Sequence, residues 1–144
     1  MTPDAPGHIH FSARVLLDST AVGRDGDSLM ATLARGPYRR RALTPATPWL
    51  DDEPPAAPAI TVQTGVDSAL VSWRVTGDEA PFLYVVYTER AGTGWSHRVL
   101  PATRLGQRIV LGSGDEEGPL PLTAVAVTAV DRMGNESTPQ VRHL

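Results

Sequence analysis

Seven short apolar runs, separated by turn-forming segments, restrict what the second half of this chain can fold into. The runs recur at about the 8–12-residue spacing of strands in a β-sandwich. The 13 prolines and 13 glycines among the 144 residues also favour short strands over long helices. We therefore expect an all-β, seven-stranded sandwich with these strands: Ala59–Gln63, Ser68–Thr76, Phe82–Glu89, Trp95–Leu100, Arg108–Gly112, Leu122–Val130 and Gln140–Arg142.

The run SALVSWRVT, residues 68–76, shows the clearest strand alternation. Side chains of a strand point alternately to its two faces, so every second residue shares a face. One face then carries apolar side chains only, and we expect it to be buried: Ala69, Val71, Trp73 and Val75.

Residues 55–144 resemble a fibronectin type III domain. The resemblance rests on Pro54-Pro55 and Pro58 ahead of the first strand, on LVSW and YVVY in the second and third strands, and on the ending VAVTAVDRMGNES. Val125 stands where such domains usually carry a corner tyrosine. The resemblance implies a fibronectin type III or immunoglobulin-like sandwich in which the third and sixth strands are neighbours.

Those two neighbouring strands predict an apolar outer face. We interpret Leu83, Val85 and Tyr87 as core residues, which leaves Phe82, Tyr84 and Val86 outside. In the sixth strand we expect Val125, Val127 and Ala129 inside, with Ala124, Ala126 and Thr128 outside. A contiguous exposed apolar patch usually marks an interface. The alternative is that one strand has the opposite phase, since FLYVVY is apolar throughout.

Residues 1–50 predict an appendage of one strand and one helix. HIHFSARVLL is strand-like, and DGDSLMATLARGPY is helix-like, with Asp27 or Ser28 as its N-cap and Gly36-Pro37 as its end. The helix has an apolar stripe of Leu29, Met30 and Leu33. A lone strand leaves unpaired backbone groups, so we expect it to pair with the sandwich or with another chain.

GHIHFSARVLL, LARGPY and ALTPATPWLDDEPPAAP resemble the last strand and helix of family 10-like glycosyl hydrolase barrels. The resemblance implies that residues 1–53 are the end of such a barrel and its linker, and that residues 54–144 are the sandwich. It also implies a bacterial, envelope-associated or secreted protein. The paired carboxylates of glycosidases would come from earlier barrel strands that this sequence lacks. We therefore assign no catalytic residue.

Five large apolar residues are candidates for an interface or a sugar contact: Trp49, Leu50, Phe82, Tyr84 and Trp95. We expect Trp49 and Leu50 to form the seam between barrel and sandwich, packed here on the sandwich near Tyr84 and Ala126. Trp95 follows a glycine turn and is placed to stack on a sugar. The predicted role is a non-catalytic accessory or docking module. The alternatives are a carbohydrate-binding module or a self-assembling interaction domain.

Charge and composition argue against a nucleic-acid-binding, metal-binding or membrane-spanning protein. The net charge is −3, and Arg39-Arg40-Arg41 is the only basic cluster, so we expect no nucleic-acid partner. There is no cysteine, and His8 and His10 lack an evident third ligand, so we expect neither a metal nor a cofactor. No apolar run reaches the roughly 18 residues of a membrane span.

Overall fold

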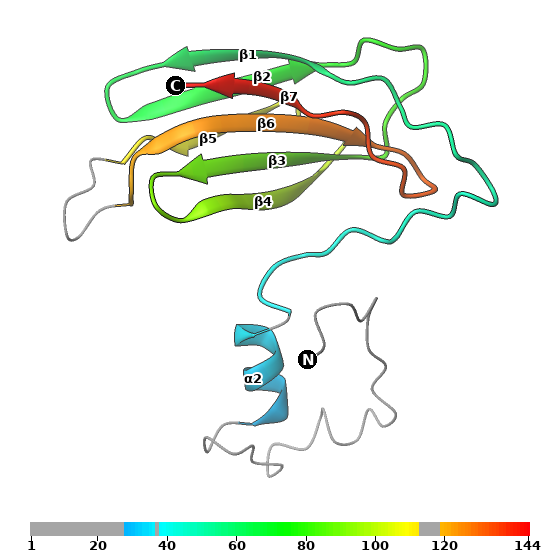
Figure 1. Cartoon of the computed structure of the whole chain (residues 1–144), viewed down its shortest axis with the longest axis horizontal. Helices are drawn as coiled ribbons and strands as arrows, with labels where there is room; N and C mark the ends of the chain where they lie inside the picture. Colours follow the sequence, from blue (N-terminus) through cyan, green and yellow to red (C-terminus); the bar gives the residue numbers. More distant parts are fainter. Residues whose placement is uncertain (1–27, 37, 113–118) are drawn as a thin grey trace. The chain divides into compact units, whose positions relative to one another are not determined.

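The computed structural model describes residues 28–36, 38–112 and 119–144, and the chain divides into two compact units, Met1–Arg41 and Ala42–Leu144 (Figure 1). In the first unit the predicted helix is confirmed as α2, Leu29–Arg35. The Ser28 hydroxyl caps it by accepting a hydrogen bond from the Ala31 amide. Leu33 is its buried residue, whereas Met30 is 47% exposed. The strand predicted from HIHFSARVLL, with His8 and His10, and the alternative cap Asp27 lie outside the described residues.

The second unit is a sandwich of two antiparallel sheets, as predicted (Figure 1). The small sheet has the order β1-β2-β5 and the large sheet the order β4-β3-β6-β7. This is the strand order of a fibronectin type III sandwich. The strands are β1 (Ala59–Thr64), β2 (Ser68–Arg74), β3 (Leu83–Arg90), β4 (Gly94–Pro101), β5 (Gly106–Val110), β6 (Leu122–Val130) and β7 (Gln140–His143).

The core between the sheets is built on the alternation of β2. Ala69, Val71 and Trp73 are buried, as predicted. Val75 is 40% exposed, contrary to the prediction, because β2 ends at Arg74 and the alternation stops there. Around Val71 and Trp73 the core collects residues from both sheets, among them Ile60, Tyr84, Val86, Leu100, Ile109, Val125 and Val127.

The predicted phase of β3 is wrong. Tyr84 is fully buried in the core, with its ring centroid 5.6 Å from that of Trp73. Tyr84 pairs with Ala129 of β6, whose side chain also faces the core. The small alanine leaves room there for the large tyrosine ring. Leu83, Val85 and Tyr87 therefore lie on the outer face. The phase predicted for β6 is confirmed, since Val125 and Val127 are core residues.

The segment before β1 covers one end of that outer face. Leu43 packs against Val85, Val99 and Val130. The Thr47 amide and hydroxyl both donate to the Met133 carbonyl, at 2.9 and 3.1 Å. The compact unit begins at Ala42, whereas the sequence resemblance implies a division between residues 53 and 54.

The loop between β6 and β7 is organised by a buried pair of polar residues. The Asp131 carboxylate accepts hydrogen bonds from the Asn135 amide at 2.9 Å and from Asn135 Nδ2 at 2.8 Å. Asn135 Nδ2 also donates to the Asp51 carbonyl at 3.0 Å. Asn135 therefore connects this loop to the segment that leads into β1.

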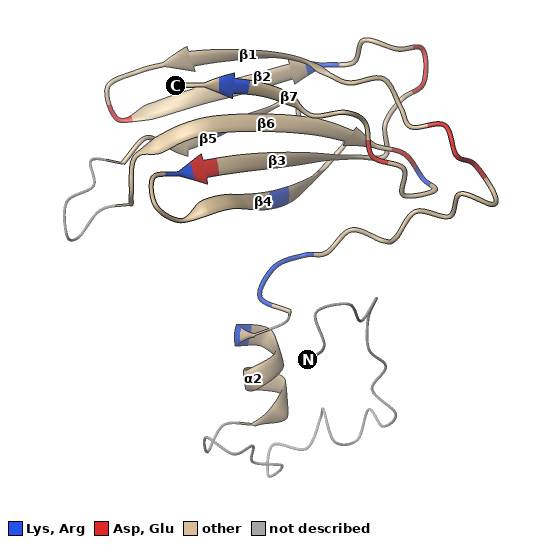
Figure 2. Ribbon diagram, in the orientation of Figure 1, with Lys and Arg blue, Asp and Glu red and all other residues tan. Residues whose placement is uncertain are grey.

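Charge is distributed unevenly between the two units. Met1–Arg41 contains 6 arginines and 4 acidic residues, a net charge of +2, whereas Ala42–Leu144 contains 7 arginines and 12 acidic residues, a net charge of −5. Figure 2 shows acidic stretches in the loop between β2 and β3 and in residues 51–53, at the end of the sandwich that carries the loop between β6 and β7. Within the described residues, no helix has the length and apolar character needed to cross a membrane.

Candidate functional site

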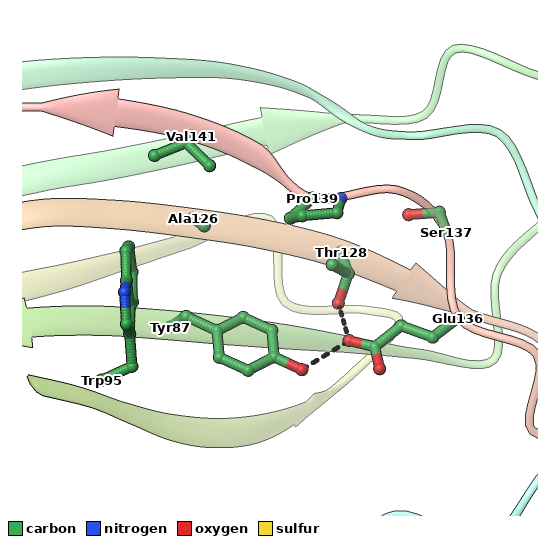
Figure 3. Close-up of a pocket in the computed structure, with 8 residues that line it drawn as sticks. All are labelled: Tyr87, Trp95, Ala126, Thr128, Glu136, Ser137, Pro139 and Val141. Carbon is green, nitrogen blue, oxygen red and sulfur yellow. Dashed lines mark hydrogen bonds between the residues drawn. The ribbon is translucent and has the colours of Figure 1, made fainter.

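The outer face of the large sheet carries an open groove of about 380 Å³. Its residues come from β3, β4, β6 and β7 and from the loop before β7, and Figure 3 shows them together. The lining consists of Tyr87, Trp95, Ala126, Thr128, Glu136, Ser137, Pro139 and Val141. We call this surface the outer groove.

The groove exists because β6 has small residues on its outer face. Ala126 and Thr128 form the floor and are 3% and 2% exposed. Ala126 pairs with Tyr87 of β3 on one side and with Val141 of β7 on the other. The larger side chains of these neighbouring strands rise above the floor. The sequence had predicted that this stretch of β6 faces outward.

Glu136 provides the charged end of the groove. Its Oε1 accepts a hydrogen bond from the Tyr87 hydroxyl at 2.6 Å and another from the Thr128 hydroxyl at 2.5 Å. Burial, followed by the hydrogen bond to Glu136 and its charge, raises the pKa of Tyr87 to about 12. The phenol therefore stays protonated and remains a donor. Within the described part of the chain, the other oxygen, Oε2, accepts no hydrogen bond.

Trp95 provides the aromatic end. It is 46% exposed and lies opposite Glu89 in the pairing of β3 with β4. Figure 3 shows Trp95 and Glu136 on either side of Tyr87. The Tyr87 ring centroid also lies 6.0 Å from that of His97. The groove thus joins an apolar floor, an exposed indole and one oriented carboxylate.

This arrangement is suited to binding. The lining contains a single carboxylate, whereas retaining glycosidases use two at about 5–5.5 Å. The described residues also contain no group of three His, Cys, Asp or Glu side chains placed to hold a metal ion. An exposed indole and an apolar floor instead provide surface for stacking and burial, with Glu136 as the polar contact.

The structure separates the five residues predicted to form an interface. Trp95 lines the outer groove. Tyr84 lies in the core and reaches neither face, which corrects its predicted exposure. Phe82 is 46% exposed, and the Arg132 guanidinium lies 5.0 Å from its ring centroid.

Trp49 and Leu50 were predicted to pack on the sandwich, and this prediction is wrong. They are 77% and 69% exposed and follow Thr47 in a turn closed by the Leu50 amide and the Thr47 carbonyl. Leu43 is a hydrophobic residue of this segment that does pack on the outer face. Local sequence favours the apolar pair Trp49 and Leu50 as the contact, whereas in the structure this segment is joined to the sandwich by the hydrogen bonds of Thr47 to the Met133 carbonyl and by Leu43.

Sequence reasoning did not assign a site role to Tyr87, Glu136 or Val141. The predicted phase of β3, which is wrong, assigns Tyr87 to the core instead of the outer face. Glu136 lies in the GNES turn, whose residues follow no strand alternation. The signal that points to this place is the row Ala124, Ala126 and Thr128, because small outward residues on a central strand leave a hollow beside larger neighbours.

No family model and no curated protein sequence matches this chain. Several solved structures are similar to it. A myokine structure has 22% identity and a TM-score of 0.44, covering 61% of this chain and 95% of its own. The spore cortex lytic enzyme SleM of Clostridium perfringens has 17% identity and a TM-score of 0.46, covering 63% of this chain and 28% of its own. A fibronectin type III domain of human collagen XX has 16% identity and a TM-score of 0.48, covering 72% of this chain and all of its own. The fold assignment rests on the strand order, since each of these TM-scores is below 0.5.

Proposed function

We propose that this chain is a non-catalytic docking module of a bacterial glycoside hydrolase-like protein, with the active site in another part of that protein. The observation that carries the docking role is the outer groove. The chain covers one end of the large sheet's outer face with Leu43 and leaves the other end, around Trp95 and Ala126, open among the described residues. Apolar surface left open in this way typically receives a partner.

The link to a glycoside hydrolase rests on the sequence resemblance of residues 1–53 to the end of a barrel. On this proposal the partner is the barrel domain of the same protein, which the sandwich positions. A location in the cell envelope or outside the cell belongs to the same proposal. The single carboxylate of the groove supports a binding role over a catalytic one.

The first experiment measures the size of the protein in its source cells, by immunoblot with an antibody raised against this chain. We expect a band several times larger than 15.4 kDa, because the module would be part of a barrel protein. A single band near 15.4 kDa would contradict the link to a barrel. The purified chain should also release no reducing ends from peptidoglycan glycan strands stripped of peptides. Turnover that survives repurification would contradict a non-catalytic role.

A carbohydrate-binding module is the second candidate, and the exposed Trp95 indole favours it. Calorimetry with peptidoglycan fragments tests this candidate, and heat that disappears in a Trp95→Ala variant would support it. Self-association through the predicted N-terminal strand is the third hypothesis. That strand lies outside the described residues, and a monomeric mass in solution would contradict it.

A further inference from the structure

We infer that the outer groove receives a basic side chain from an extended protein segment, with the aliphatic stem over Ala126 and the cationic head on Glu136. This inference rests on the proposed docking function and names the chemistry of the partner. It begins with the geometry of Glu136. Two hydroxyl groups, from Tyr87 and Thr128, hold Oε1, so the carboxylate has a fixed orientation. Oε2 remains available to a donor from outside.

Among the described residues, the Glu136 carboxylate has no charged partner. Within the described residues, its carboxylate receives hydrogen bonds only from the neutral Tyr87 and Thr128 hydroxyls. A cationic donor adds charge attraction to its hydrogen bond with a carboxylate, which a neutral donor does not add. A guanidinium or ammonium group is therefore the donor that gains most from Oε2.

The arginines closest in the pairing pattern point away from the groove. Arg98 pairs with Val86, and Arg142 pairs with Val125, so both belong to rows whose β3 and β6 residues face the core. Arg132 lies over the Phe82 ring. Within the described residues, none of these three arginines is bonded to Glu136, and we infer that the cation on Oε2 is supplied by a partner.

The groove walls fit the stem of a basic side chain. Ala126, Pro139 and Val141 form an apolar track that leads to Glu136. Arginine and lysine bury their methylene groups on such surfaces while the charged head reaches a polar group. Trp95, beyond Tyr87, provides a surface for an apolar neighbour of the basic residue (Figure 3).

A sugar fits this lining less well because the hydroxyl groups of the lining already donate their hydrogens within the protein. The Ser137 hydroxyl accepts from the Ala129 amide and donates to the Thr138 carbonyl. The Tyr87 and Thr128 hydroxyls donate to Glu136. A sugar ring would stack on Trp95 with few partners for its hydroxyl groups.

The charge of the whole unit supports a basic partner. Ala42–Leu144 carries 7 arginines against 12 acidic residues, a net charge of −5. Some of the acidic residues lie in loops at the end of the sandwich that carries the loop before β7 (Figure 2). A negative field of this kind steers cationic ligands and raises their association rate.

The test uses the full chain, labelled with ¹⁵N, and two acetylated and amidated tripeptides. One is leucyl-arginyl-leucine, and the other replaces arginine with the neutral, nearly isosteric citrulline. We expect the arginine peptide to shift the amide signals of Ala126, Glu136 and Val141, and the citrulline peptide to bind about tenfold more weakly. Equal affinity of the two peptides, or shifts confined to other surfaces, would overturn the inference.

Matched variants separate the charge of Glu136 from the general charge of the domain. Glu136→Gln keeps an acceptor for Tyr87 and Thr128 and removes the charge, so the arginine peptide should bind about as weakly as the citrulline peptide. Glu79→Gln removes the same charge from an exposed loop and should change the affinity by less than about twofold. Unchanged amide spectra of both free variants establish that they are folded. Full affinity in Glu136→Gln would overturn the inference.

A titration with a saccharide tests whether the groove binds a sugar instead of a basic side chain. An N-acetylglucosamine tetramer that shifts the groove signals, with no response to the arginine peptide, would overturn the inference and favour a carbohydrate-binding module. If both probes fail while the native protein is large and the chain inactive, the docking role stands and only the partner chemistry named here is wrong.

Discussion

Two polar atoms in the core have no hydrogen-bond partner among the described residues: Trp73 Nε1 and the Tyr84 hydroxyl. Their rings are in contact, with an interplanar angle of 60°. Burial raises the pKa of Tyr84, which means that its phenol stays neutral. A buried polar group without a partner costs about 1–3 kcal/mol of stability. The aromatic pair therefore stabilises the sandwich through the apolar surface that it buries, whereas its two unpaired polar atoms lower the free energy of unfolding.

Removing the Tyr84 hydroxyl should consequently not harm the protein. We expect Tyr84→Phe to leave the free energy of unfolding unchanged or to raise it by about 1 kcal/mol, measured by urea denaturation. Tyr87→Phe is the matched control, because it removes a hydroxyl that does have a partner, and it should lower the free energy by about 1–2 kcal/mol. A clear loss in Tyr84→Phe would mean that the hydroxyl has a partner, such as a buried water.

Tyr87 also makes a prediction about alkaline pH. Its pKa in the folded state, about 12, lies above its usual value of 10.0. The protonated phenol is thus favoured by folding, and its contribution to stability is complete below pH 10 and is lost as the pH rises from about 10 to 12. Denaturation curves at pH 9 and pH 11 should show a smaller loss of stability in Tyr87→Phe than in the unmodified chain. An identical loss would contradict the assignment to Tyr87.

The sequence predicts which face of its strand Trp73 occupies, but it does not predict this for Tyr84. Trp73 lies in a run where polar and apolar residues alternate, so its face is evident. Tyr84 lies in FLYVVY, where both faces are apolar and either phase satisfies the pattern. The choice depends on the pairing of Tyr84 with Ala129, a contact between distant segments that local alternation does not contain.

Among the elements, the loop between β6 and β7 positions both the incoming segment and Glu136. Gly134 has φ +87°, a conformation that favours glycine. A Cβ at this position would meet the Thr44 carbonyl oxygen at 2.9 Å and the Pro45 carbonyl oxygen at 3.0 Å. The residue after it is Asn135, which connects the loop to Asp51. The backbone of the incoming segment lies against this glycine because there is no side chain between them.

Gly134→Ala should therefore destabilise the sandwich by more than backbone strain alone. We expect a loss of about 2–3 kcal/mol in the free energy of unfolding, because the Cβ would also displace backbone atoms of residues 44 and 45. Gly92→Ala is the control. Its φ is +75° but nothing lies within 4 Å of the added Cβ, so it should lose only about 1 kcal/mol. Equal losses would contradict the close approach at Gly134.

The same loop explains why the groove was predicted only in part. The row of small residues on β6 follows strand alternation, and its outward direction was correctly expected. Glu136 reaches the groove from a turn, where no periodicity predicts the direction of a side chain. Its contact with Tyr87 joins residues 49 positions apart. A prediction from local pattern finds the floor of such a site more readily than its polar end.

At the scale of the whole molecule, the outer face of the large sheet has two parts. One end is covered by residues that precede β1, and the other end is open to solvent among the described residues. Leu43 and its neighbours bury Val85, Val99 and Val130, and the outer groove begins beyond them. Residues 42–53 therefore belong to the same compact unit as the two sheets.

Two truncated chains test where the sandwich begins. A chain of residues 42–144 should unfold at the same urea concentration as the sandwich of the full chain. A chain of residues 54–144 should be less stable by about 2–4 kcal/mol, because it loses the packing of Leu43 and the hydrogen bonds of Thr47 and Asp51. It should also bind a hydrophobic dye, since Val85 and Val99 become exposed.

Leu43→Ser in the full chain should reproduce about half of this loss in the free energy of unfolding. Equal stability of the two truncated chains would instead support the division at residues 53/54, with the proline cluster as a true linker and Leu43 as an incidental contact.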